Sequence, residues 1–147
     1  MARERLLFLD EDVPKRLAKE LRDRGRNTTT IYSTDLKGRR DHELLPELVP
    51  RFGPNVVLVT ADEDMPEQHG KALREAGMTV AVIDGRHKQH GYPDEEQDAW
   101  KREVVHRWAH TMQLQAVGTI RRYSLHRHGE WRSRIRGGRR RKPPIPF

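Results

Sequence analysis

The sequence contains no cysteine and no long apolar run, and each absence excludes a class of protein. Without cysteine the chain forms no disulfide and offers no thiolate to a metal, which fits a reducing compartment such as the cytoplasm. No apolar stretch approaches the roughly 20 residues that span a bilayer, and the short run Leu6–Leu9 lacks the apolar core of a signal peptide. We therefore expect a cytoplasmic protein that makes no contact with a membrane.

Hydrophobic residues are also scarce, at 34% against 35% charged residues, so we expect part of the 147-residue chain to be tail or exposed surface. The net charge of +7 is unevenly distributed. Residues from 117 onward hold 10 of the 29 Lys and Arg residues and one of the 22 Asp and Glu residues, which leaves 19 bases and 21 acids before them. Such a basic segment either meets phosphates or an acidic partner, or only solubilises the chain as a disordered tail.

Hydrophobic patterning predicts strands that alternate with helices. The predicted strands cover residues 6–9, 28–32, 55–60 and 78–83, and the predicted helices cover 13–24, 41–52, 67–76 and 95–116. Alternation of this kind is typical of a mainly parallel sheet with right-handed crossovers. We therefore expect an α/β domain over residues 1–116 that ends in a C-terminal helix.

A basic C-terminal extension is expected over residues 117–147. It begins with a possible hairpin, whose strands would cover 119–125 and 131–136, and it ends in a tail too charged and proline-rich to fold by itself. Tyr123 and Trp131 lie among its arginines, where they either stack bases or fasten the hairpin to the domain. The arginines that we expect to bind nucleic acid are Arg121, Arg122, Arg132, Arg134, Arg139, Arg140 and Arg141.

Acidic residues follow two of the predicted strands, as Asp10-Glu11-Asp12 and as Asp62-Glu63-Asp64. In an open parallel sheet, ligands bind beyond the carboxyl ends of the strands. Carboxylates gathered there without His or Cys suit Mg²⁺ or Mn²⁺, which activate water and stabilise charge on a phosphate. Any single acid is also common as a helix cap or turn residue, but two clusters at equivalent strand ends favour a functional site.

Three segments resemble PIN-like proteins of the Mut7-C and VapC-related type. Phe8–Pro14 is similar to the opening strand of that family, which continues into Asp-Glu-Asn and a helix often introduced by proline. Leu36–Leu45 is similar to its Gly-x-x-Asp-x-Glu segment, and Val57–Met65 is similar to its Leu-Val-Thr-x-Asp-x-Asp-Phe signature. The matches fall in the family's order and span about residues 6 to 84. Asp12 replaces the family's usual Asn, and Met65 replaces its usual Phe.

The resemblance implies a PIN-like three-layer sandwich and a ribonuclease that depends on Mg²⁺ or Mn²⁺. It also implies the toxin half of a toxin–antitoxin pair, with RNA and a cognate antitoxin as partners and a homodimer as a possible state. Carried over by position, the implied catalytic residues are Asp10, Asp41, Glu43, Asp62 and Asp64. Of these, Asp10, Glu43, Asp62 and Asp64 would hold the metal, with Asp41 as the alternative to Glu43.

Two other functions share parts of this pattern. A non-catalytic PIN-like module would bind nucleic acid or an antitoxin through the basic tail and would need the arginines but no metal. A receiver domain would also alternate strands and helices, but it needs an acceptor Asp at the end of the third strand and a Lys after a fifth strand. The third predicted strand ends in Thr60 instead, and no fifth strand or matching Lys is evident.

Overall fold

The structure is a computed structural model, and it describes residues 5–33, 47, 50, 51, 55–84, 94–132, 135, 136, 139 and 140. Six strands form the main sheet: β1 (Leu6–Leu9), β2 (Thr28–Thr30), β3 (Val56–Thr60), β4 (Thr79–Ile83), β5 (Ile120–Tyr123) and β6 (His128–Glu130). The helices are α1 (Arg16–Asp23), the 3₁₀ helix η1 (Ile31–Ser33), α3 (Met65–Glu75) and α4 (Asp94–Gln113). Strands β7 (Ile135–Arg136) and β8 (Arg139–Arg140) pair separately.

The strand order in the main sheet is β2-β1-β3-β4-β5-β6, parallel throughout except for the antiparallel β6. The chain moves in one direction along the sheet from β1 to β2 and in the other direction from β3 to β5. The direction therefore changes between β1 and β3, and in doubly wound sheets this switch point is where ligands bind. The fold class predicted from the sequence, an α/β domain with a mainly parallel sheet, is confirmed at this level.

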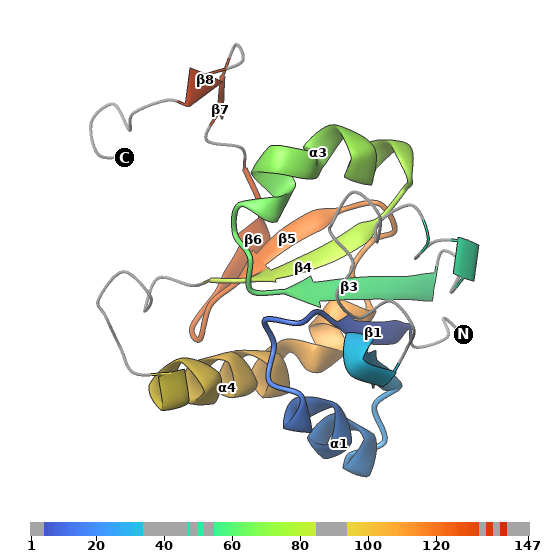
Figure 1. Cartoon of the computed structure of the whole chain (residues 1–147), viewed down its shortest axis with the longest axis vertical. Helices are drawn as coiled ribbons and strands as arrows, with labels where there is room; N and C mark the ends of the chain where they lie inside the picture. Colours follow the sequence, from blue (N-terminus) through green and yellow to red (C-terminus); the bar gives the residue numbers. More distant parts are fainter. Residues whose placement is uncertain are drawn as a thin grey trace.

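The sheet is buried on both faces, which explains why its central strands are continuously apolar (Figure 1). On one face α1 and α4 cover Leu7, Leu9, Val57, Val59 and Ala81. On the other face α3 and η1 cover Phe8, Leu58, Val80 and Val82. Alternate residues of each strand thus enter separate cores, and the described part of the chain forms three layers.

The crossover through α4 has a hand opposite to those through α1 and α3. Crossovers that share one hand place their helices on opposite faces when they run in opposite directions along the sheet. The β1–α1–β2 and β3–α3–β4 crossovers obey this rule, but α4 runs the same way as α3 and lies on the face of α1. Since about 98% of such connections are right-handed, the expectation of uniformly right-handed crossovers is wrong for this one.

Two predicted strands have different limits in the structure. The strand predicted over 28–32 ends at Thr30 and continues as η1, because the Thr30 hydroxyl accepts a hydrogen bond from the Tyr32 amide at 3.0 Å and turns the chain. The second hairpin strand covers 128–130 rather than 131–136, because the Ser124 amide bonds to the Arg127 carbonyl at 2.8 Å and closes a tight turn. The helix predicted over 41–52 lies largely outside the described residues.

The hairpin strand predicted over 119–125 is β5, and it is the fifth parallel strand of the main sheet, a pairing that the sequence did not reveal. It pairs with β4 from Val80↔Ile120 to Ile83↔Tyr123, so β5 and β6 belong to the sheet although they lie beyond the boundary expected at residue 117. The tryptophans of α4 secure this edge. Trp100 donates to the Asp84 carbonyl at 3.0 Å and Trp108 donates to the Ser124 carbonyl at 2.7 Å, at the ends of β4 and β5.

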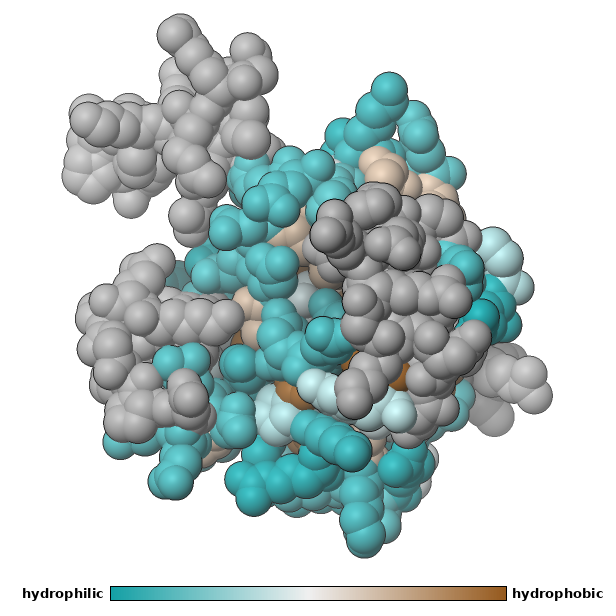
Figure 2. Space-filling model, in the orientation of Figure 1, coloured by the Kyte–Doolittle hydropathy of each residue, from teal (hydrophilic) through white to brown (hydrophobic). Residues whose placement is uncertain are grey.

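Hydrophilic side chains cover most of the described surface on the face shown in Figure 2, and hydrophobic atoms are visible only in small gaps between them. This agrees with a core enclosed by helices on both sides of the sheet. Within the described ranges, no helix combines the length and the apolar character that crossing a membrane requires.

Candidate functional site at the carboxyl edge of the sheet

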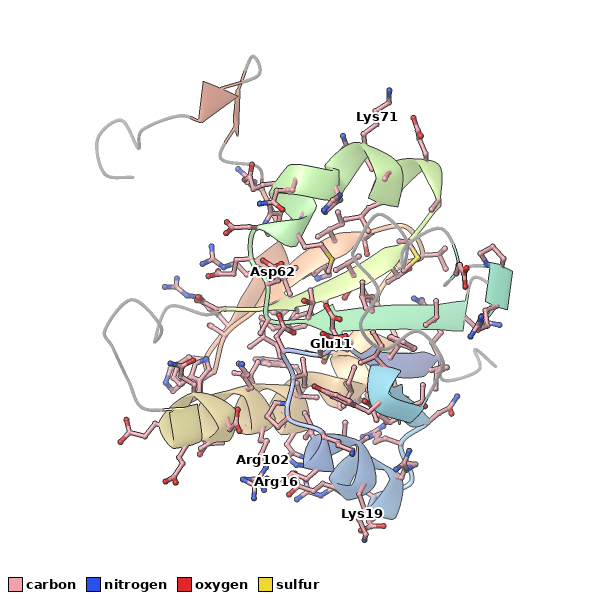
Figure 3. All side chains as sticks on the ribbon, in the orientation of Figure 1. Glu11, Arg16, Lys19, Asp62, Lys71 and Arg102 are labelled. Carbon is pink, nitrogen blue, oxygen red and sulfur yellow. The ribbon has the colours of Figure 1, made fainter. Side chains whose placement is uncertain are left out.

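The register of β1 and β3 brings the two acidic loops together. Leu9 pairs with Val59, and the Asp10 amide then donates to the Val59 carbonyl at 3.0 Å. Asp10 and Thr60 are therefore the first residues beyond matching points on neighbouring strands. This position is the carboxyl edge of the sheet at its switch point. The loops that leave β1 and β3 there carry the Glu11 and Asp62 side chains labelled in Figure 3.

One hydroxyl group joins two carboxylates at this edge. The Thr60 Oγ1 lies 3.1 Å from Oδ2 of Asp10 and 3.4 and 3.3 Å from Oδ1 and Oδ2 of Asp12. A hydroxyl carries a single hydrogen, so it donates to one carboxylate at a time. The backbone amide of Ala61 also donates to Asp12 Oδ1, at 3.1 Å. The carboxylates of Asp10 and Asp12 therefore both lie within hydrogen-bonding distance of the Thr60 hydroxyl.

The backbone of the first acidic loop is held in place from several sides. The Asp10 side chain is only 8% exposed and accepts a hydrogen bond from the Glu11 amide at 2.8 Å. Lys101 of α4 is 7% exposed, and its Nζ donates to the Asp12 carbonyl at 2.6 Å. The ammonium thus fixes the loop that carries both carboxylates. The sequence does not single out Lys101, although it precedes Val104 by one turn on the buried stripe of the helix.

The second acidic loop begins α3. The Thr60 hydroxyl accepts from the Asp62 amide at 3.1 Å, and the Asp62 carboxylate accepts from the Asp64 amide at 3.0 Å. Asp62 is partly buried and Asp64 is exposed, and Asp64 makes no side-chain cap to the helix. The Asp62 backbone amide therefore shares the Thr60 hydroxyl with the Asp10 and Asp12 carboxylates. Among the described residues, Asp64 makes no contact with that hydroxyl.

The metal shell predicted from the sequence is not assembled among the described residues. Asp41 and Glu43 lie outside them, and in the part of the chain that is described no group of three or more His, Asp or Glu side chains is placed to hold a metal ion. Instead, Asp12 contacts the Thr60 hydroxyl together with Asp10. In the sequence, Asp12 stands out only as an added charge in place of the family's Asn. Mg²⁺ binds proteins through one or two carboxylates, with water and substrate phosphates completing its octahedron. Asp10 and Asp12 fit that requirement.

Arginine side chains border the acidic edge along β5 and β6. Arg122 donates to Glu63 at 2.7 Å and to Asp84 at 3.2 Å, so it joins the ends of β3 and β4. Arg121 contacts Nδ1 of His128 at 3.0 Å, and Arg132 is exposed. Of the remaining predicted arginines, Arg139 and Arg140 form β8, whereas Arg134 and Arg141 lie outside the described residues.

Tyr123 is structural. It is fully buried, and its hydroxyl donates to Oε1 of Gln115 at 2.9 Å. Burial raises the pKa of this phenol to about 12. Of the two uses that the sequence left open for Tyr123, the structure therefore favours fastening the β5–β6 hairpin to the domain. Trp131 differs, because it is only partly buried and lines two hollows on the surface.

A cleft of about 350 Å³ opens beside this edge, between the ends of β4 and β5 and the turn that leads to β6. Asp84 and Arg122 line it, and Arg127 and His128 from the turn line its other side. The Arg122 guanidinium also lines a smaller hollow next to Glu63 and Asp64. Cationic groups thus lie next to the acidic loops, an arrangement that suits a phosphate approaching a bound divalent ion.

The histidines of α4 serve the contact with α1. Nε2 of His106 lies 3.1 Å from Glu20 Oε1, and its Nδ1 lies 3.1 Å from Nη1 of Arg24. His110 Nδ1 lies 3.2 Å from Nη1 of Arg26. These contacts agree with the interpretation of the two histidines as a polar helix face.

Comparison with known proteins gives no match to any family model, to any curated protein or to any solved structure.

Proposed function

We propose that the protein is a ribonuclease that depends on Mg²⁺ or Mn²⁺ and hydrolyses RNA phosphodiester bonds at the carboxyl edge of its sheet. The observation that carries the proposal is the convergence of the Asp10 and Asp12 carboxylates on the Thr60 hydroxyl at the switch point. The PIN-like resemblance of residues 6 to 84 supports it independently. The same resemblance supports a PIN-like fold type and a role as the toxin of a toxin–antitoxin pair.

Asp10 and Asp12 would hold the ion, which would supply an activated water and charge stabilisation at the phosphate. Thr60 orients both carboxylates, and Lys101 fixes the loop between them. Asp62 accepts a hydrogen bond within the second loop and adds negative charge beside the pair. Arg122, held between Glu63 and Asp84, would provide a guanidinium to orient a phosphate at this edge. Asp41 and Glu43 enter as candidates from the resemblance alone.

The test combines cleavage with direct measurement of metal binding. Purified protein is incubated with a mixed RNA pool in Mn²⁺ or in EDTA, and Mn²⁺ binding is measured by calorimetry. Asp10→Asn and Asp12→Asn should abolish cleavage and weaken Mn²⁺ binding, because each removes one charged ligand. Asp23→Asn is the matched control, since Asp23 is an exposed acid that pairs with Lys19 at 2.9 Å on α1. Cleavage that survives in EDTA, or in both site variants, would refute the proposal.

A non-catalytic module that binds nucleic acid is the second candidate. The observation in its favour is that the described residues place only two carboxylates, Asp10 and Asp12, on the shared hydroxyl and include no larger acidic group placed to hold a metal. A module of this kind would retain RNA in EDTA and would be indifferent to the Asp10→Asn and Asp12→Asn substitutions. The proposed antitoxin partner and the proposed homodimer are compatible with either candidate. Copurification of the protein with a small partner protein would test the proposal of an antitoxin.

A further inference from the structure

A second groove, of about 630 Å³, lies between α3 and the β5–β6 pair. Arg74 of α3 lines one side, and Arg121, Trp131 and Arg132 line the other. The Trp131 amide donates to the Ile120 carbonyl at 3.0 Å, so Trp131 stands beside the first residue of β5. The groove therefore starts at the amino edge of the parallel sheet, away from the acidic loops.

The charge in this groove is positive and largely uncompensated. Arg74 and Arg132 are exposed, and within the described ranges no hydrogen bond or ion pair engages either guanidinium. Arg121 contacts a histidine, and Glu130 is the one acid among the lining residues. Arg102 and Arg122, in contrast, are paired with Glu20 and Glu63. Unpaired guanidiniums that flank a groove are suited to phosphate, which they can bind through two parallel hydrogen bonds.

Trp131 provides a rigid aromatic surface between these guanidiniums. Part of the side chain packs against the core beneath α3, and the residue lines the groove. Trp100 and Trp108, in contrast, lie on the opposite side of the sheet and use their indole N–H groups to hold strand ends. An anchored indole in a basic groove is the arrangement on which unpaired bases stack.

The groove adjoins a smaller hollow at the candidate catalytic edge. Trp131 and Arg132 also line the smaller hollow that contains Glu63, Asp64 and Arg122. We propose that this groove binds single-stranded RNA, with phosphates at Arg74 and Arg132 and a base stacked on Trp131, and leads the strand toward the acidic loops. The proposal rests on the proposed function in taking the polymer to be RNA. It specifies a single strand because a base must leave its duplex stack to reach the indole.

The test is binding of a short fluorescein-labelled RNA of mixed sequence, followed by anisotropy in EDTA over a range of salt concentrations. Arg74→Gln and Arg132→Gln should each weaken binding about three- to tenfold and lower the salt slope by about 0.7, the value for one phosphate contact on a single strand. Trp131→Ala should weaken binding about fivefold to 100-fold. Trp131→Phe should keep part of the affinity and should remove the quenching of tryptophan fluorescence by RNA.

Arg16→Gln is the matched control, because Arg16 is an exposed arginine on α1, on the other side of the sheet. Arginine variants that bind as Arg16→Gln does, or a duplex that competes as well as a single strand, would overturn the groove. Binding in EDTA separates this proposal from the nuclease. If the wild type cleaves RNA and Arg74→Gln and Arg132→Gln leave KM unchanged, only the groove proposal is refuted. If RNA binding depends on the groove but no cleavage occurs, only the nuclease proposal is refuted.

Discussion

Arg102 and Glu20 form a two-pronged ion pair across the contact between α4 and α1. Nε of Arg102 donates to Oε1 of Glu20 at 3.0 Å, and Nη2 donates to Oε2. His106 adds a third contact to the same carboxylate. The pair joins residues that are 82 positions apart in the sequence, so it fastens the helix that leaves β1 to the helix that follows β4.

The Arg102 hydrogen bond to Glu20 predicts sensitivity to acid. It lowers the pKa of the Glu20 carboxyl from 4.5 to about 2. Because this pKa is lowered on folding, the stability that the ion pair contributes is fully present above pH 4.5 and is lost as the pH falls toward about 2. Glu20→Gln should cost about 1 kcal/mol at neutral pH and should flatten that acid dependence, as measured by urea unfolding. Asp23→Asn should change stability by less than about 0.5 kcal/mol, and equal losses in the two variants would contradict the argument.

The buried Tyr123 predicts sensitivity to alkali. Burial raises its pKa from 10 to about 12. The stability that the buried neutral phenol contributes is therefore complete below pH 10 and is lost as the pH rises toward about 12. Tyr123→Phe leaves Oε1 of Gln115 without this donor and should cost about 1 to 3 kcal/mol, as measured by thermal unfolding. Tyr32→Phe is the control, because the Tyr32 hydroxyl bonds to the Glu11 carbonyl at an exposed position. An unchanged melting temperature in Tyr123→Phe would show that the hydroxyl is dispensable for stability.

The Thr60 hydroxyl predicts a coupling between stability and metal binding. Thr60→Val keeps the shape of the side chain but removes the donor between Asp10 and Asp12 and the acceptor for the Asp62 amide. We expect a loss of about 1 to 3 kcal/mol and Mn²⁺ binding about tenfold weaker, since second-shell contacts orient metal ligands. Thr60→Ser should restore both quantities. The measurement is calorimetry with Mn²⁺. An unchanged Mn²⁺ affinity in Thr60→Val would show that Thr60 does not orient the metal ligands.

Lys101 is predicted to position the Asp10–Asp12 loop through its hydrogen bond to the Asp12 carbonyl. Lys101→Met keeps the length of the side chain in the core but leaves the Asp12 carbonyl without its ammonium partner. Stability should fall by about 1 to 3 kcal/mol, and kcat for RNA cleavage should fall while KM stays near its wild-type value. Glu103→Gln, an exposed change on the same helix, should alter neither. A fall in stability without any change in kcat would restrict Lys101 to the fold.

The sequence predicts the interior of this fold better than its edges. Continuous apolar runs identify β1, β3 and β4 because each strand is buried on both faces, and the four-residue spacing of Trp100 to Met112 identifies α4. The sequence indicated a hairpin strand over 119–125 but not its place as β5 in the main sheet, because Ile120–Tyr123 contains two arginines, one of which is paired with acids at the ends of β3 and β4. An arginine whose acidic partners lie far away in the sequence resembles, in the sequence alone, an arginine that faces solvent.

The candidate site was predictable in position but not in composition. Two acid clusters after strands indicated the carboxyl edge, which is where the structure places Asp10 and Asp62. The contact of Asp12 with the Thr60 hydroxyl, the ammonium of Lys101 and the groove at Trp131 depend on side-chain distances between residues about 50 to 90 positions apart, and no local pattern encodes them.

The position of α4 on the same face as α1 has a consequence for synthesis. During translation, α1 emerges with Leu17 and Leu21, and α4, which completes the core that they share with the sheet, follows some 80 residues later. Because α4 follows β4 in the chain, β1, β3 and β4 can assemble while the part of this face that α4 covers is still exposed. A nascent chain stalled before residue 94 would then present the apolar part of the sheet and of α1 that α4 covers, and ribosome-associated chaperones are expected to engage it there.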